Sequence, residues 1–162
     1  MTHKPAQTKL ELTWPGKQNR PRLEPRILLE DKVLSYCYPY QKFQSVEGEW
    51  RFAQLLEDDP EVIKWMKPAP GQFRIEYRNG RNYEPDFVVE TTNACLLVEP
   101  KRADQMELDE VQAKARAALR WCGHANDHAA AHGGKRWRYL LVPDTAIQLG
   151  RSVKMLSAES AL

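Results

Sequence analysis

The chain has 162 residues, of which 42% are hydrophobic and 28% are charged, and this composition fits one folded domain of ordinary size. No run approaches the ~18 consecutive apolar residues of a transmembrane helix, and the N-terminal stretch lacks the apolar segment of a secretory signal. Three widely spaced cysteines form no CxxC pair. These features disfavour a disulfide framework or a zinc knuckle and predict a cytoplasmic protein without a membrane partner.

The net charge of +2 conceals an uneven distribution. Residues 1–48 carry 8 basic and 5 acidic side chains, and residues 133–154 carry 5 basic and 1 acidic. Residues 49–98 have the opposite balance, with 6 basic and 9 acidic. Basic flanks around an acidic centre suit a polyanion-binding surface built around a cation-binding pocket, although ordinary surface charge gives the same pattern.

The N-terminal part of the chain is predicted to be extended. Four prolines interrupt residues 1–30 and disfavour a helix there. Leu10 and Leu12 alternate with polar residues, as they would in a short edge strand. We therefore expect residues 1–44 to form an extended, basic, Pro-containing arm.

Two helices are predicted after the arm. Ser45 is a suitable N-cap, and apolar residues follow it at helical spacing until the chain reaches residues 58–60. Pro60 then suits the first position of a second, shorter helix. Residues 62–66 would form the apolar face of that helix.

Three strands are expected next. Ile75 and Tyr77 alternate with charged residues and lead into Asn79-Gly80, a strong hairpin signal. The return strand should cover residues 82–90. The apolar run at residues 94–98 suits a strand that is buried on both faces.

The last predicted elements are a long helix over residues 105–126 and a fourth strand over residues 137–142. The order of helix, three strands, helix and strand predicts an α/β fold with a small mixed β-sheet flanked by helices. The main domain would span residues 45–150, and residues 151–162 would form a C-terminal tail.

Asp86, Glu99 and Lys101 are the candidate catalytic residues. Glu99 and Lys101 lie two apart on one predicted strand, so their side chains leave the same face. Asp86 lies on the preceding strand, about 4.8 Å away, close enough for both carboxylates to bind one divalent cation. Lys101 would stand beside the water on that cation, and the carbonyl oxygen of Pro100 is a further candidate ligand. Hydrolysis of a phosphodiester requires such an arrangement.

Short patterns of this kind also arise by chance, and a Glu–Lys pair on a strand is often an ordinary surface ion pair. The surrounding sequence favours a metal site over a chance pattern. Both carboxylates are embedded in apolar strand sequence, where an unpaired charge costs several kcal/mol to bury. Two acids placed there imply a positive partner, and Mg²⁺ is the simplest candidate, with Mn²⁺ as a substitute.

Weaker candidates for contacts to nucleic acid are basic side chains near the predicted strands and at the start of the long helix. Lys135, Arg136 and Arg138 surround an aromatic residue next to the last strand, where they could touch phosphate. Lys114 opens the long helix. Solvated surface explains these residues equally well.

The Pro-Asp and Glu-x-Lys elements resemble the signature of the PD-(D/E)XK nuclease superfamily. Residues 45–147 more closely resemble the C-terminal nuclease domain of the restriction (Res) subunits of type III restriction enzymes. The matching segments keep their order: Glu49-Trp50-Arg51-Phe52-Ala53, Val62-Ile63-Lys64-Trp65, Tyr83-Glu84-Pro85-Asp86-Phe87-Val88-Val89, Lys114-Ala115-Arg116-Ala117-Ala118 with Trp121-Cys122, and Trp137-Arg138-Tyr139-Leu140-Leu141-Val142-Pro143.

The resemblance implies a further acidic residue on the first helix that reaches the same metal. Glu49 is the match, because an aromatic-Ala pair follows it three residues later, and Glu47 is the competitor. The sequence departs from the family pattern at Pro100, where a β-branched residue is commoner, and at Arg102, where Gly is frequent. Neither departure removes a carboxylate or the lysine.

The resemblance thus implies a Mg²⁺-dependent DNA endonuclease of a restriction or defence type. DNA would be the substrate, and an ATP-dependent helicase or translocase subunit and a DNA methyltransferase would be partners. A homo-oligomer stays an open alternative. The rival interpretation is a catalytically silent nucleic-acid-binding or assembly module that has kept a nuclease-like fold.

Overall fold

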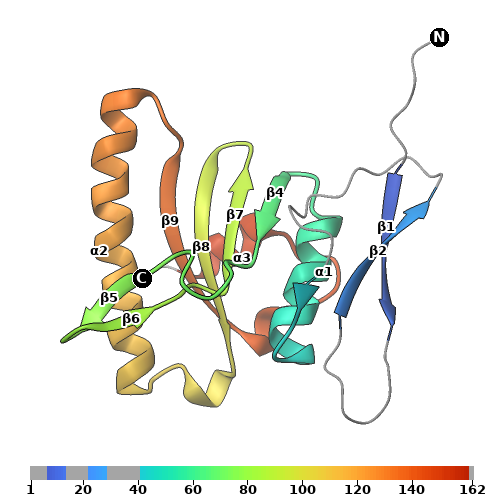
Figure 1. Cartoon of the computed structure of the whole chain (residues 1–162), viewed down its shortest axis with the longest axis horizontal. Coiled ribbons are helices and arrows are strands. Elements are labelled where there is room, and N and C mark those ends of the chain that lie inside the picture. Colours follow the sequence, from blue (N-terminus) through green and yellow to red (C-terminus); the bar gives the residue numbers. More distant parts are fainter. Residues whose placement is uncertain (1–6, 14–21, 29–40, 161–162) are drawn as a thin grey trace.

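The computed structural model describes residues 7–13, 22–28 and 41–160 of the chain, and its side chains from residue 43. A four-stranded mixed sheet lies at the centre of the part that follows the arm (Figure 1). Its strand order is β4 (Val62–Met66), β7 (Phe87–Thr91), β8 (Ala94–Lys101) and β9 (Arg136–Pro143). The first three strands pair antiparallel, and β9 runs parallel to β8.

Helices cover both faces of this sheet, so the α/β class and the small flanked mixed sheet are as predicted. One face packs on α1 (Arg51–Asp58) and α3 (Val153–Glu159). The other face packs on α2 (Asp109–His132) and on the hairpin of β5 (Ile75–Arg78) and β6 (Arg81–Tyr83). Alternation along the strands separates the two cores: Val98 faces the α1 side, whereas Leu97 faces the α2 side.

The helical start at Ser45 is confirmed. The Ser45 Oγ accepts a hydrogen bond of 3.0 Å from the backbone N–H of Glu49, as an N-cap should. The first turn, Val46–Trp50, is π-helical and continues into α1. Gly48 in this turn lies close to the sheet, because a Cβ built on it would stand 3.6 Å from the Cβ of Pro100 on β8.

The second predicted helix is wrong, because residues 62–66 form strand β4. Val62 pairs with Thr91 and Lys64 with Glu90, so Ile63 is an extra residue in a β-bulge. The bulge separates the two buried side chains, Val62 and Trp65, by three residues. This spacing imitates a helical period, which explains the error.

The hairpin at Asn79-Gly80 is confirmed, with both residues at positive φ, 33° and 78°. The predicted return strand over residues 82–90 is divided in two. β6 ends at Tyr83 and β7 begins at Phe87, so the Glu84-Pro85-Asp86 segment carries the chain from the small sheet to the central one.

The remaining bounds differ modestly from the predictions. The long helix covers 109–132 and not 105–126, and it ends at Gly133, whose φ of 69° suits a left-handed C-cap. The last strand is two residues longer than expected. The segment taken as a C-terminal tail contains α3, whose Val153 and Leu156 are buried against the sheet.

The predicted arm contains paired strands. β1 (Gln7–Thr13) and β2 (Arg22–Leu28) are antiparallel, and the short β3 (Gln41–Lys42) pairs with the start of β2. The short edge strand predicted around Leu10 and Leu12 is thereby confirmed. Every helix in the described part of the chain is too short or too polar to cross a bilayer.

Candidate metal and nuclease site

Asp86 and Glu99 lie next to each other at the end of the central sheet. Phe87 on β7 pairs with Val98 on β8, so one further step of the antiparallel register sets Asp86 opposite Glu99. Directly opposed residues point to the same face of a sheet. The Glu84-Pro85-Asp86 crossover therefore places one carboxylate immediately before β7, against the other near the end of β8.

Lys101 and Tyr83 both contact Glu99. The Nζ of Lys101 is 3.5 Å from Glu99 Oε1, as expected for residues two apart on one strand. The Tyr83 hydroxyl donates a hydrogen bond of 3.0 Å to Glu99 Oε2. Glu99 is 8% exposed and Tyr83 is 3% exposed, so the two side chains orient each other within the protein.

Glu49, on the π-helical turn, is also buried, whereas Glu47 is exposed. The Glu49 Oε2 accepts the backbone N–H of Gln44 at 2.8 Å and lies 2.8 Å from the Nζ of Lys67. The same Nζ lies 3.8 Å from Asp86 Oδ1. Between the two predicted ligands Glu49 and Asp86, the structure thus places a lysine ammonium.

Burial shapes the protonation of this group of side chains. Burial, followed by the negative charge of Glu99, raises the pKa of the Asp86 carboxyl well above its ordinary value, while Lys67 acts in the opposite direction. Burial also raises the pKa of Glu99, opposed first by the charge of Lys101 and then by the hydrogen bond from Tyr83. A cation beside these carboxylates would favour their ionised forms.

These residues open onto one cleft of about 630 Å³. Its walls come from five segments far apart in the sequence: the turn before α1, the β6–β7 crossover, the end of β8 with the residues after it, the start of α2, and Asp144 after β9. Acidic residues outnumber basic ones in its lining, with Glu47, Glu49, Glu84, Asp86, Glu99 and Asp144 against Lys101, Arg102 and Lys114. The cleft therefore favours cations.

The oxygen donors in the cleft suit a hard divalent cation. Asp86, which is partly buried, and Glu99, which is buried, provide two neighbouring carboxylates, the ligand type that Mg²⁺ prefers. Pro100 also lines the cleft. However, the described residues contain no cluster of three or more His, Cys, Asp or Glu side chains arranged to hold a metal. The fit thus rests on the Asp86–Glu99 pair, with Glu49 engaged by Lys67.

The weaker basic candidates divide into two groups. Lys114 lines the cleft, where its Nζ is 2.9 Å from Glu110 Oε1. Residues 135–138 lie elsewhere, because Arg136 pairs with Ala94 at the start of β8, five residues before Glu99. At ~3.3 Å per residue, that cluster is roughly 16 Å from the carboxylates along the strand.

Individually, the three basic residues of that cluster differ in their surroundings. Lys135 forms an ion pair of 2.7 Å with Glu90. Arg138 donates a hydrogen bond of 3.3 Å to the Ser157 carbonyl. Arg136 is exposed. The structure does not bring these side chains into the cleft.

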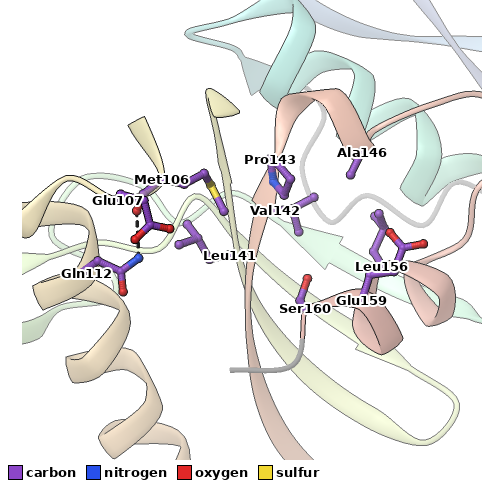
Figure 2. A pocket seen from close by; sticks show the side chains of 10 residues that line it. All are labelled: Met106, Glu107, Gln112, Leu141, Val142, Pro143, Ala146, Leu156, Glu159 and Ser160. Atoms are coloured by element: carbon purple, nitrogen blue, oxygen red, sulfur yellow. Dashed lines mark hydrogen bonds between the residues drawn. The ribbon is translucent and has the colours of Figure 1, made fainter. Parts of the chain in front are cut away.

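Two other cavities have fewer charged residues in their linings than the cleft has. One, of about 280 Å³, lies between the start of α2, the end of β9 and α3 (Figure 2). Its carboxylates, Glu107 and Glu159, lie on opposite sides in that view. The other, of about 720 Å³, includes Asp59, whose carboxylate already accepts the backbone N–H groups of Glu61 and Val153.

Sequence reasoning missed Lys67 and Tyr83. A signal for Lys67 exists in hindsight, since it is a charged residue directly after the apolar run of β4, just as Glu99 follows the apolar run of β8. Predicting a helix in place of β4 removed Lys67 from consideration.

Comparisons with protein-family models, with curated proteins and with solved structures found no match for this chain.

Proposed function

We propose that this chain is a Mg²⁺-dependent DNA endonuclease with a PD-(D/E)XK-like core, of a restriction or defence type. The observation that carries the proposal is the set of Asp86, Glu99 and Lys101 in one cleft. Two adjacent carboxylates, buried Glu99 and partly buried Asp86, face the same side of the sheet, and the Lys101 ammonium lies 3.5 Å from that of Glu99. We also propose that the chain works with an ATP-dependent helicase or translocase subunit and with a DNA methyltransferase.

Each residue of the set has a distinct role in this proposal. Asp86 and Glu99 hold the cation, and Tyr83 fixes the orientation of Glu99 through its hydrogen bond. When bound, Mg²⁺ would supply a water of lowered pKa and offset charge on the phosphate. Lys101 orients the attacking water and stabilises the negative charge that develops in the transition state.

One observation favours the rival function, a catalytically silent nucleic-acid-binding or assembly module. The Lys67 ammonium already provides a positive partner for Glu49, and it lies 3.8 Å from Asp86, without any metal. A silent module would bind DNA and leave it intact. A cleavage assay therefore separates the two functions.

The assay follows the nicking of supercoiled plasmid in Mg²⁺ and in EDTA. We expect cleavage in Mg²⁺ only, and we expect Asp86→Asn, Glu99→Gln and Lys101→Met each to lower its rate at least ~100-fold, because the ion or its oriented water is lost. Glu90→Gln is the matched control, since Glu90 lies at the other end of β7 in surface ion pairs with Lys64 and Lys135. Wild-type-like cleavage by Lys101→Met would overturn the assigned roles.

A further inference from the structure

Lys67 is a buried charged residue that the proposed catalytic set does not use. It directly follows β4, and its side chain is only 10% exposed. Its Nζ lies 4.7 Å from the centroid of the Phe87 ring and 5.8 Å from that of Phe43. Lysines usually extend their ammonium group into water. The aromatic contacts and the Glu49 ion pair instead hold this one inside the protein.

The position of the ammonium determines what Glu49 can do. Glu49 Oε2 already receives two donors, the backbone N–H of Gln44 and the Nζ of Lys67, both at 2.8 Å. The Lys67 ammonium thus neutralises the Glu49 carboxylate, although Glu49 itself lines the cleft. The same Nζ also lies 3.8 Å from the Oδ1 of Asp86. Lys67 therefore lies between the helix acid and the carboxylate pair of the sheet.

We propose that Lys67 is a positioning residue that keeps Glu49 out of the set of metal ligands and holds Asp86 beside Glu99. This inference rests on the proposed function, because it concerns the same cleft. With all five groups ionised, Glu49, Asp86, Glu99, Lys67 and Lys101 sum to a charge of −1. Removing Lys67 changes this sum to −2 and frees Glu49 as a third carboxylate. The site should then bind divalent cations more tightly while its catalytic geometry is lost.

The test is a calorimetric titration of the full chain with Mn²⁺. Lys67→Met should bind Mn²⁺ about 10-fold more tightly than the wild type, because affinity rises with the number of charged oxygen ligands. Lys67→Arg keeps the charge and should restore an affinity close to the wild-type value. Lys64→Met is the matched control, since Lys64 lies on β4 three residues before Lys67, but its side chain is 60% exposed. Lys67→Gln replaces Lys67→Met if the latter does not fold.

The double variant Glu49→Gln/Lys67→Met separates the role of Glu49 from a general effect of charge. The gain in affinity should disappear in it. Persistence of the gain, or an unchanged or weaker affinity in Lys67→Met, would overturn the inference while leaving the proposed function intact. Absence of Mn²⁺ binding in every protein, wild type included, would instead overturn the proposed function.

A second measurement tests the ion pair without any metal. In EDTA, the effects of Glu49→Gln and Lys67→Met on the urea midpoint should be strongly non-additive, because the two side chains contact each other directly. Additive effects would show that the Lys67–Glu49 pair is not coupled, and would overturn the inference.

Discussion

The carboxyl group of Asp86 is placed where ionisation is unfavourable in the absence of a bound cation. Its pKa is raised above the ordinary value of 3.8 by burial and by Glu99. In the pH range between 3.8 and the raised pKa, the folded chain binds more protons at this group than the unfolded chain. The free energy of unfolding therefore falls as pH rises through that range, and it stays lower above it.

Asp86→Asn should consequently stabilise the metal-free protein. In EDTA at pH 7.5, we expect its free energy of unfolding to exceed that of the wild type by on the order of 1 kcal/mol, because a partly buried carboxyl group whose ionisation is disfavoured is replaced by a neutral amide. The fall in its free energy of unfolding as pH rises above 3.8 should also be smaller than in the wild type. Urea denaturation across a pH series measures both effects.

Glu90 provides a control, because the pKa of its carboxyl is shifted in the opposite direction to that of Asp86. Hydrogen bonds from Lys135 and Lys64 lower the pKa of its carboxyl, so its ionised form favours the folded state. Glu90→Gln should therefore cost a small amount of stability, as expected for surface ion pairs. An Asp86→Asn protein that is less stable than the wild type, with an unchanged pH dependence, would contradict this account of the site.

The turn before α1 and the end of β8 depend on each other through Gly48. A Cβ at this position would stand 2.9 Å from the Ser45 Oγ, the atom that caps the helix. The same turn carries Glu49 and packs against Pro100, next to Glu99. The absence of a side chain at Gly48 thus lets the helix start lie beside the carboxylate pair.

Gly48→Ala should destabilise the protein by up to about 1 kcal/mol, since the loss of the capping hydrogen bond outweighs the gain in helix propensity. Gly123→Ala is the matched control within α2, where a Cβ would meet nothing within 4 Å. Helix propensity predicts that this second substitution stabilises the protein by about 0.5–1 kcal/mol. Thermal unfolding of both variants checks the contrast, and two effects of the same sign would refute the packing argument.

The elements that were predicted well are those whose signals are local. The Ser45 cap and the Asn79-Gly80 turn depend on residues a few positions apart, and both form as expected. β4 contains a bulge where it pairs with β7, and this bulge changes the spacing of buried residues from which a strand would be predicted. The predicted strand over residues 82–90 is likewise interrupted at residues 84–86, because its first part pairs in the two-stranded sheet and its second part pairs in the central sheet.

The candidate site likewise contains some residues that local sequence predicts and others that only the fold brings together. Strand geometry alone predicts that Glu99 and Lys101 share a face, and the antiparallel register then adds Asp86. Lys67 and Tyr83 belong to other elements, so only the assembled fold reveals their contacts. The charge balance of the cleft is also a property of the whole molecule, because its walls come from five separate segments.

The acidic lining of the cleft predicts how DNA binding depends on metal. Six acidic and three basic residues repel a polyanion unless a divalent cation is present. Affinity for a labelled duplex should fall at least ~10-fold in EDTA, and Ca²⁺ should restore binding with poor cleavage, because its looser coordination positions water less well. Fluorescence anisotropy measures both. Equal affinity in EDTA and Ca²⁺ would place DNA outside this cleft.

The most direct test of the central claim, that Asp86 and Glu99 support hydrolysis of DNA, is cleavage in ¹⁸O-labelled water with Mg²⁺. Mass spectrometry of the products then shows whether oxygen from water enters the terminal phosphate. The account predicts one ¹⁸O atom per new terminal phosphate with the wild type and with Glu90→Gln, and no product above background with Asp86→Asn. Intact DNA with the wild type, or equal labelled product with Asp86→Asn, would contradict it.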